Sequence, residues 1–141
     1  MALLEKQLEV KESNIPGAGK GLFTKEFIPK GTRITEYKGR IRTWKAVENE
    51  DGNYYIFYVN EDCVIDASRQ KKVLARYIND AKGLQKIKGL TNNAQFVVDG
   101  LQAFVEAKKD IPAGAEIFVG YGKEYWDVIR RNIKLDANTN R

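Results

Sequence analysis

Turn-forming residues interrupt this sequence so often that no long helix or strand fits between most of them. Clusters rich in glycine, proline, asparagine and aspartate occur at residues 14–17, 29–31, 51–53, 60–62, 99–100 and 110–114. Short extended segments separated by such turns, at intervals of about 8–12 residues, are typical of domains built mainly from β-strands. The sequence therefore predicts many short strands and little helix.

The segments between the turns have the β-branched and aromatic composition of strands. The clearest strand signal is residues 54–59, Tyr-Tyr-Ile-Phe-Tyr-Val. Asp99-Gly100 predicts a hairpin between residues 95–98 and 102–107, because this dipeptide favours a tight turn. Further short strands are expected at residues 8–10, 22–24, 32–37, 64–65 and 116–119.

Three segments favour helix. Thr43 is a suitable N-cap for one or two turns within residues 43–50, and Ser68 for a longer helix over residues 68–78. A terminal helix is expected at residues 126–135. No internal repeat or linker is visible, so the sequence predicts one mostly-β domain.

The composition narrows the classes of protein further. The chain has 141 residues, of which 43% are hydrophobic and 30% charged, as expected for one soluble globular domain. No apolar run approaches the roughly 20 residues that a membrane helix needs, and the first residues do not resemble a signal peptide. With Cys63 as the only cysteine and no histidine, the sequence excludes an intrachain disulfide, a Cys/His zinc site and a histidine-dependent catalytic triad. We expect no metal site and an intracellular location, in the cytoplasm or nucleus.

The formal net charge of +5 allows a polyanionic partner. The lysines and arginines are spread along the chain without a block of five like charges, which favours a solvated surface. Nucleic acid is therefore not expected as a direct ligand. The carboxylates of Asp62 and Asp66 are expected to be solvated rather than catalytic.

A cluster of three glycines, Gly17, Gly19 and Gly21, allows the backbone to approach a ligand closely. The cluster lacks the Gly-Lys-Ser/Thr ending of a phosphate-binding P-loop, and taken alone it predicts only a turn.

The order of several short motifs is more informative than any one of them. From about Leu8 to Trp126 the chain resembles the SET domain of protein lysine methyltransferases, as in the small viral SET proteins. The motifs are, in order, Gly19-Lys20-Gly21-Leu22-Phe23, Tyr37-Lys38-Gly39, Ile65-Asp66-Ala67, Ala75-Arg76-Tyr77-Ile78-Asn79, Asn93-Ala94 and Gly120-Tyr121-Gly122.

The resemblance implies a β-clip fold of several short curved sheets, a few short helices and a knot-like threaded C-terminal segment. It implies residues 1–127 as the SET domain and residues 128–141 as a C-terminal helix or tail. The cysteine-rich segments that flank many SET domains are missing, so we expect residues 125–135, or a second subunit in a homodimer, to complete the lysine channel.

The resemblance also implies the activity and the site. S-adenosyl-L-methionine would donate a methyl group to the side-chain amine of a lysine in a protein or peptide, such as a histone or another small basic protein. Tyr121 and Tyr37 would be the catalytic hydroxyls, and Tyr55 and Phe96 the channel walls. The cofactor would contact Gly19, Lys20, Gly21, Leu22, Arg76, Asn79, Asp80, Asn93, Tyr121 and Trp126.

The sequence departs from the family pattern at three places. Asp80 stands where the family has histidine, Gly120 stands where it often has an acidic residue, and Asn79 and Asn93 lie 14 positions apart, which indicates an insertion at residues 82–90. These departures leave an alternative open: a SET-like module that binds S-adenosyl-L-methionine or a peptide without turnover. Phe96, where some relatives carry tyrosine, would permit more than one methylation.

Overall fold

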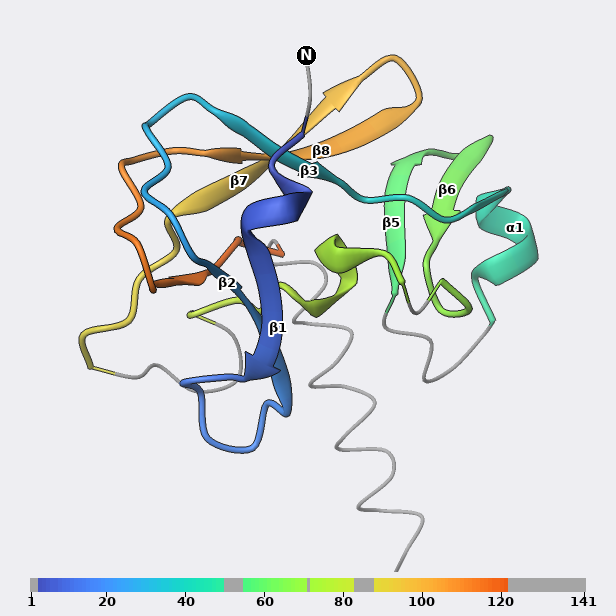
Figure 1. Cartoon of the computed structure of the whole chain (residues 1–141). Coiled ribbons are helices and arrows are strands. Elements are labelled where there is room, and N and C mark those ends of the chain that lie inside the picture. The colour runs from blue at the N-terminus through green and yellow to red at the C-terminus, as the bar shows by residue number, and fades with distance from the viewer. Residues whose placement is uncertain (1–2, 50–54, 71, 83–87, 122–141) are drawn as a thin grey trace, which may run out of the picture.

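A computed structural model describes residues 3–49, 55–70, 72–82 and 88–121. Within these ranges the chain forms nine short strands, one short α-helix and two 3-10 turns (Figure 1). In order they are η1 (Glu5–Gln7), β1 (Leu8–Glu12), β2 (Lys20–Thr24), β3 (Arg33–Glu36), β4 (Arg40–Arg42), α1 (Trp44–Val47), β5 (Ile56–Asn60), β6 (Cys63–Asp66), η2 (Leu74–Tyr77), β7 (Ala94–Asp99), β8 (Gln102–Ala107) and β9 (Glu116–Ile117). The predicted mostly-β fold is confirmed.

The strands form three small antiparallel sheets. Their strand orders are β1-β2-β9, β3-β8-β7 and β4-β6-β5, and Figure 1 shows the third sheet, with α1, at one side of the other two. Apolar side chains from all three sheets and from η2 share one buried cluster, which includes Leu22, Ile34, Ile65, Ile78 and Ile117. Since no sheet has more than three strands, the shared core holds the domain together.

The hairpin β7–β8 forms as predicted, and a glycine occupies the position in its turn that has a positive φ. Asp99 pairs with Gln102, which leaves Gly100 and Leu101 as the two central residues. Gly100 has φ of +64°, while no described residue other than glycine has a positive φ. A positive φ at the first central position alone is the pattern of a type II′ turn, which places glycine there.

The helix predicted at residues 68–78 is wrong. Only Leu74–Tyr77 forms a 3-10 turn, and its N-cap residue is Val73 rather than Ser68. The N–H of Gln70 donates to the carbonyl of Ala67 and the N–H of Val73 to that of Gln70, so the segment forms separate turns. The guanidinium of Arg76 also donates to the carbonyls of Ala67 and Ser68, at 3.0 and 3.1 Å. The cap at Thr43 is confirmed, because its hydroxyl accepts from the N–H of Ala46 at the start of α1. β4 and η1 were not predicted.

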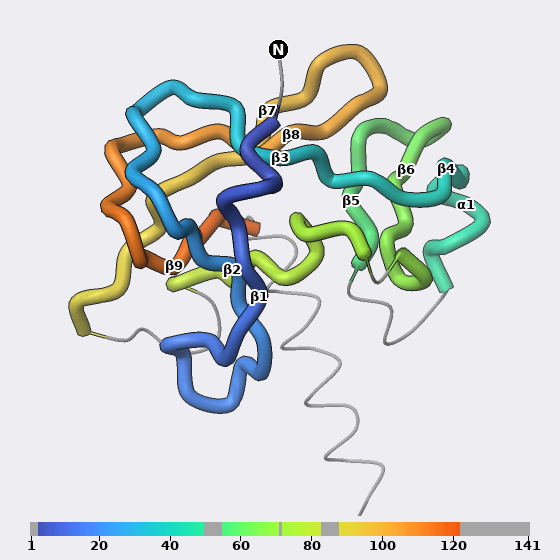
Figure 2. The backbone as a smooth tube through the Cα atoms, in the orientation of Figure 1, coloured from blue at the N-terminus to red at the C-terminus, as the bar shows by residue number. Residues whose placement is uncertain are grey.

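The end of the described chain runs through the middle of the molecule, beside β2 (Figure 2). Phe118 lies in a parallel bridge with Asn79 on one side, and Val119 lies in a parallel bridge with Ala94 on the other. The N–H of Val119 donates to the carbonyl of Asn79, and the N–H of Ala94 donates to the carbonyl of Phe118, both at 2.9 Å. This segment therefore lies between two stretches of chain that are joined by residues 80–93, as the expected threaded arrangement requires.

The predicted helix at residues 126–135 and part of the insertion at residues 82–90 lie outside the described residues. None of the helices found in the described ranges is long and apolar enough to cross a membrane.

Candidate active site

The glycine cluster leads into β2, where Gly21 packs tightly against β9. Gly19 has φ of +76°, a backbone conformation that glycine adopts without strain. A Cβ atom at Gly21 would lie 2.2 Å from Oε2 of Glu116 and 3.2 Å from Cβ of Ser13. The absence of a side chain at Gly21 thus leaves the space that the carboxylate of Glu116 occupies.

The carboxylate of Glu116 connects three segments of the chain. Its Oε1 accepts from the N–H of Asn14 at 2.8 Å, and its Oε2 accepts from the hydroxyl of Ser13 at 2.7 Å. The amide nitrogen of Asn79 lies 3.4 Å from the same Oε2. Glu116 is only 3% exposed, so hydrogen bonds to this carboxylate replace those that water would provide.

Asn79 connects the glycine cluster to the threaded segment. Its side-chain amide donates to the carbonyl of Lys20 at 3.0 Å, and its backbone carbonyl accepts from the backbone N–H of Val119. Lys20 is exposed, whereas the side chain of Leu22 is fully buried in the core. Of the cofactor residues predicted here, the structure thus brings Lys20, Gly21 and Asn79 together, and it leaves Leu22 only its backbone for contact with a ligand.

Asp80 holds Tyr121 in place. Its Oδ2 accepts from the backbone N–H of Tyr121 at 2.9 Å. Its Oδ1 accepts from the N–H of Lys82 at 2.8 Å and from the side-chain amide of Asn92 at 3.0 Å. The Asn92 side chain in turn accepts from the N–H of Ala81. The residue that departs from the family pattern is therefore a buried carboxylate that orders the backbone of the predicted catalytic tyrosine.

The hydroxyl of Tyr121 donates to the carbonyl of Ile78. Ile78, Asn79 and Asp80 are consecutive, so one three-residue stretch contacts both the glycine cluster and Tyr121. Asn93 lies against the other side of the threaded segment, where its amide donates to the carbonyl of Glu116 and accepts from the N–H of Phe118.

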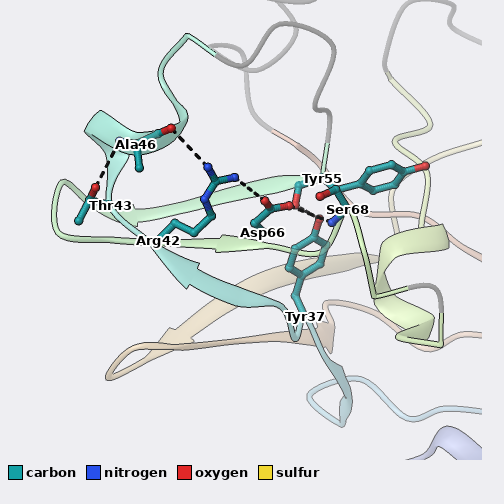
Figure 3. Close-up of polar contacts among 7 residues, drawn as sticks. All are labelled: Tyr37, Arg42, Thr43, Ala46, Tyr55, Asp66 and Ser68. Atoms are coloured by element: carbon teal, nitrogen blue, oxygen red, sulfur yellow. Dashed lines mark hydrogen bonds and ion pairs between the residues drawn. The ribbon is translucent and has the colours of Figure 1, made fainter.

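Other predicted site residues belong to a group of aromatic rings. Tyr37 lies edge-on to Phe96, with ring centroids 6.0 Å apart, and Phe57 lies 5.9 and 4.8 Å from Tyr37 and Phe96. The hydroxyl of Tyr37 donates to the carbonyl of Tyr55 at 2.8 Å (Figure 3). Three of the four predicted tyrosine and phenylalanine positions, Tyr37, Tyr55 and Phe96, are therefore neighbours.

Arg76 supports this aromatic group. Its guanidinium carbon lies 4.1 Å from the centre of the Tyr55 ring and 5.5 Å from that of Tyr77. The same guanidinium donates to Ala67 and Ser68, and the N–H of Ala67 donates to the carbonyl of Tyr55. Arg76 thus fixes the chain that follows β6 against Tyr55.

Asp66 is not solvated, in contrast to the prediction. It is 7% exposed, and its Oδ2 pairs with Nη1 of Arg42 at 2.8 Å (Figure 3). Its Oδ1 accepts from the N–H of Ser68. The strand register explains the burial, because Arg40 and Asp66 face each other between β4 and β6 and Arg42 lies on the same face as Arg40.

Phe57 and Glu116 were not predicted as site residues. Phe57 is two residues after Tyr55 on the same extended segment, and strand alternation places both side chains on one face. This spacing could have identified Phe57 as a site residue. Glu116 had no such signal, since a glutamate in a strand is ordinarily exposed. Trp126, predicted to cover the cofactor, lies outside the described residues.

A comparison with protein families matches residues 19–122 to the family described as SET domain. The match covers more than half of the chain and includes all the motifs that contact one another in the structure.

Curated relatives agree with this match. The chain is 30% identical over 126 residues to the histone-lysine N-methyltransferase, H3 lysine-4 specific, of Schizosaccharomyces pombe, which covers 83% of this chain and 13% of that protein. It is 26% identical over 147 residues to the N-lysine methyltransferase KMT5A of Xenopus tropicalis, covering 94% of this chain and 40% of that protein. It is 32% identical over 112 residues to the histone-lysine N-methyltransferase NSD3 of Mus musculus, covering 73% of this chain and 7% of that protein. The chain therefore spans well under half the length of these relatives.

Proposed function

Because this chain belongs to the SET-domain family, we propose that it transfers a methyl group from S-adenosyl-L-methionine to the side-chain amine of a lysine in a protein substrate. Relatives named as histone-lysine and N-lysine methyltransferases support the reaction class. They make histones and other small basic proteins the first substrates to test.

One observation carries the proposal: the stretch Ile78, Asn79 and Asp80 connects the glycine cluster to Tyr121. Asn79 contacts the backbone of the glycine cluster, and Asp80 and Ile78 hold the backbone and hydroxyl of Tyr121. A cofactor seated at the glycine cluster would therefore be fixed relative to Tyr121 by a few hydrogen bonds. Such fixed geometry is what a displacement reaction needs, because alignment supplies much of its rate.

The residues at the cofactor end suit the amino-acid portion of S-adenosyl-L-methionine. Gly19 and Lys20 are exposed residues, and the side-chain amide of Asn79 lies beside Lys20. The Arg76 side chain packs on Tyr55 in the aromatic group and the Asn93 side chain binds the threaded segment, so their proposed contacts to the cofactor would be backbone contacts. When bound, S-adenosyl-L-methionine would supply an electrophilic methyl group on a positively charged sulfur.

The aromatic group suits the lysine. The apolar faces of Tyr37, Phe57 and Phe96 can cover the hydrocarbon stem of a lysine side chain. The amine must lose its proton, against an unperturbed pKa of about 10.4, before its lone pair can attack. A dry aromatic channel disfavours the charged amine, and the hydroxyls of Tyr37 and Tyr121 would orient the neutral form.

The alternative of binding without turnover now has less support. It was based on Asp80 and on the insertion, and the Asp80 carboxylate accepts three hydrogen bonds, one of them from the backbone N–H of Tyr121. Asp80 thus has a structural role that is compatible with activity.

The test is the variant Tyr121→Phe, which removes the hydroxyl and keeps the ring. We expect transfer of labelled methyl to a panel of histones and small basic proteins to fall at least about 100-fold, as is usual when a positioned catalytic group is lost. Affinity for S-adenosyl-L-methionine, measured by calorimetric titration, should change less than about threefold.

Tyr58→Phe is the matched control, because Tyr58 is 52% exposed and lies outside the aromatic group around Tyr37. Its turnover should equal that of the wild type. Binding of the cofactor by the wild-type chain with no transfer to any protein would favour the non-catalytic module, and unchanged turnover in Tyr121→Phe would disprove the role of the hydroxyl.

A further inference from the structure

The orientation of the Asn79 amide is fixed by its surroundings. Its nitrogen lies 3.0 Å from the carbonyl oxygen of Lys20 and 3.4 Å from Oε2 of Glu116. A backbone carbonyl and an ionised carboxylate only accept hydrogen bonds, so both neighbours require the NH₂ group of the amide on this side. The oxygen of the amide must point the other way, and no described residue donates to it.

Two further donors bind the carboxylate of Glu116 beside Asn79. The N–H of Asn14 and the hydroxyl of Ser13 bind its two oxygens, at 2.8 and 2.7 Å. The bare Cα of Gly21 closes the space beside the carboxylate. Among the described lysines and arginines none forms an ion pair with Glu116, so its negative charge is balanced only by N–H and O–H donors.

We propose that Glu116 is a positioning residue that acts through Asn79 and makes the cofactor end selective for a hydrogen-bond donor. Glu116 and the carbonyl of Lys20 each accept one hydrogen of the amide, so the amide oxygen is the atom presented to a ligand. A negatively charged acceptor also polarises the amide and makes that oxygen a stronger acceptor. The ligand group that matches it is an ammonium, such as the α-ammonium of an amino-acid portion.

This inference rests on the proposed function only for the identity of the ligand. S-adenosyl-L-methionine carries an α-ammonium, whereas 5′-methylthioadenosine has the same adenosine and sulfur without the amino-acid portion. The two compounds therefore separate an effect on the ammonium from a general disturbance of the site.

The variant Glu116→Gln tests the inference with almost no change in shape. If the retained oxygen stays on the N–H of Asn14, the new NH₂ faces Ser13 and Asn79. The hydroxyl of Ser13 can turn and accept, but the amide of Asn79 can accept only by turning over, which presents NH₂ to the ligand. We expect affinity for S-adenosyl-L-methionine to fall at least about tenfold, which is about 1.4 kcal/mol, while affinity for 5′-methylthioadenosine changes less than about twofold.

Ser13→Ala is the matched control, because it removes one donor from the same carboxylate without altering Asn79. Its affinity for both compounds should stay within about twofold of wild type. In the double variant Asn79→Ala with Glu116→Gln, the second change should have no further effect, because Glu116 acts only through Asn79.

A measurement on the wild-type chain covers the case in which Glu116→Gln does not fold. Both side-chain amide hydrogens of Asn79 should exchange slowly with solvent, because both have protein acceptors. Fast exchange of these hydrogens would overturn the inference, as would an equal loss of affinity for both compounds in Glu116→Gln. These outcomes do not depend on turnover, so absence of methyl transfer would count against the proposed function alone.

Discussion

The two ends of the candidate site are built from different kinds of contact. At the proposed cofactor end, the carboxylate of Glu116 and the amide of Asn79 connect separate segments through hydrogen bonds. At the proposed lysine end, Tyr37, Phe57 and Phe96 meet ring to ring, and the hydroxyl of Tyr37 adds one hydrogen bond to Tyr55.

This difference separates two kinds of sensitivity to mutation. The hydrogen-bonded end depends on which atom donates and which accepts, so a change that keeps shape and reverses polarity should damage it. The aromatic end depends on volume, so a change that keeps the ring should be tolerated. The following predictions test this contrast, beginning with the largest expected effect on stability.

The largest effect should come from replacing the closely packed glycine at each end, Gly39 at the aromatic end and Gly21 at the hydrogen-bonded end. A Cβ atom at Gly39 would lie 2.4 Å from the backbone oxygen of Asp66, whereas one at Gly21 would first meet the side-chain carboxylate of Glu116. Backbone cannot move aside as a side chain can. We expect Gly39→Ala to lower the free energy of unfolding by about 3 kcal/mol and Gly21→Ala by about 1–2 kcal/mol, both measured by urea unfolding.

Gly120→Ala is the control for this pair, since its Cβ atom would lie 3.5 Å from the amide nitrogen of Asn92, an ordinary contact. It should cost less than about 1 kcal/mol. Equal costs for Gly39→Ala and Gly21→Ala would show that the two ends are equally rigid.

A smaller effect is expected for Tyr37→Phe at the aromatic end. The carbonyl of Tyr55 loses one donor but keeps the N–H of Ala67, at 3.0 Å, so no buried acceptor is left without a partner. The free energy of unfolding should fall by about 1 kcal/mol or less. A loss above about 2 kcal/mol in urea unfolding would show that this end also depends on polar contacts.

The smallest effect on stability is expected for Phe96→Tyr, which keeps the ring of a half-buried residue. Stability should change by less than about 0.5 kcal/mol. Under the proposed function the added hydroxyl would occupy space in the lysine channel, so the products should shift towards monomethyl-lysine. Mass spectrometry of a methylated peptide gives the ratio, and an unchanged ratio would remove Phe96 as a determinant of product.

The sequence predicted strands better than it predicted helices, for a physical reason. Strand residues 102–107 and the Asp99-Gly100 turn carry local signals, and both are where they were expected. The segment after Ser68 carries a local helix signal as well, but it forms separate turns, and the side chain of Arg76 folds back onto the carbonyls of Ala67 and Ser68. This contact spans eight or nine residues and cannot be seen in a short window.

The candidate site divides in the same way. Tyr37, Asn79 and Tyr121 were recognised from motifs, and the structure places each of them in a defined hydrogen bond. The burial of Glu116 and Asp66 was not predicted, because charged residues become buried only when partners from distant segments satisfy them. Ser13 and Glu116, for example, are separated by 103 positions.

The threaded segment has a consequence for how the chain acquires its fold. Phe118 and Val119 complete bridges to Asn79 and Ala94, and Glu116 completes the site around Ser13. During synthesis the ribosome makes these residues after almost all of their partners, so the nascent chain cannot close its core until residue 121 has left the exit tunnel. Contacts between such distant positions slow folding. We therefore expect this small domain to fold only once residue 121 has left the tunnel, and more slowly than a helical bundle of equal length.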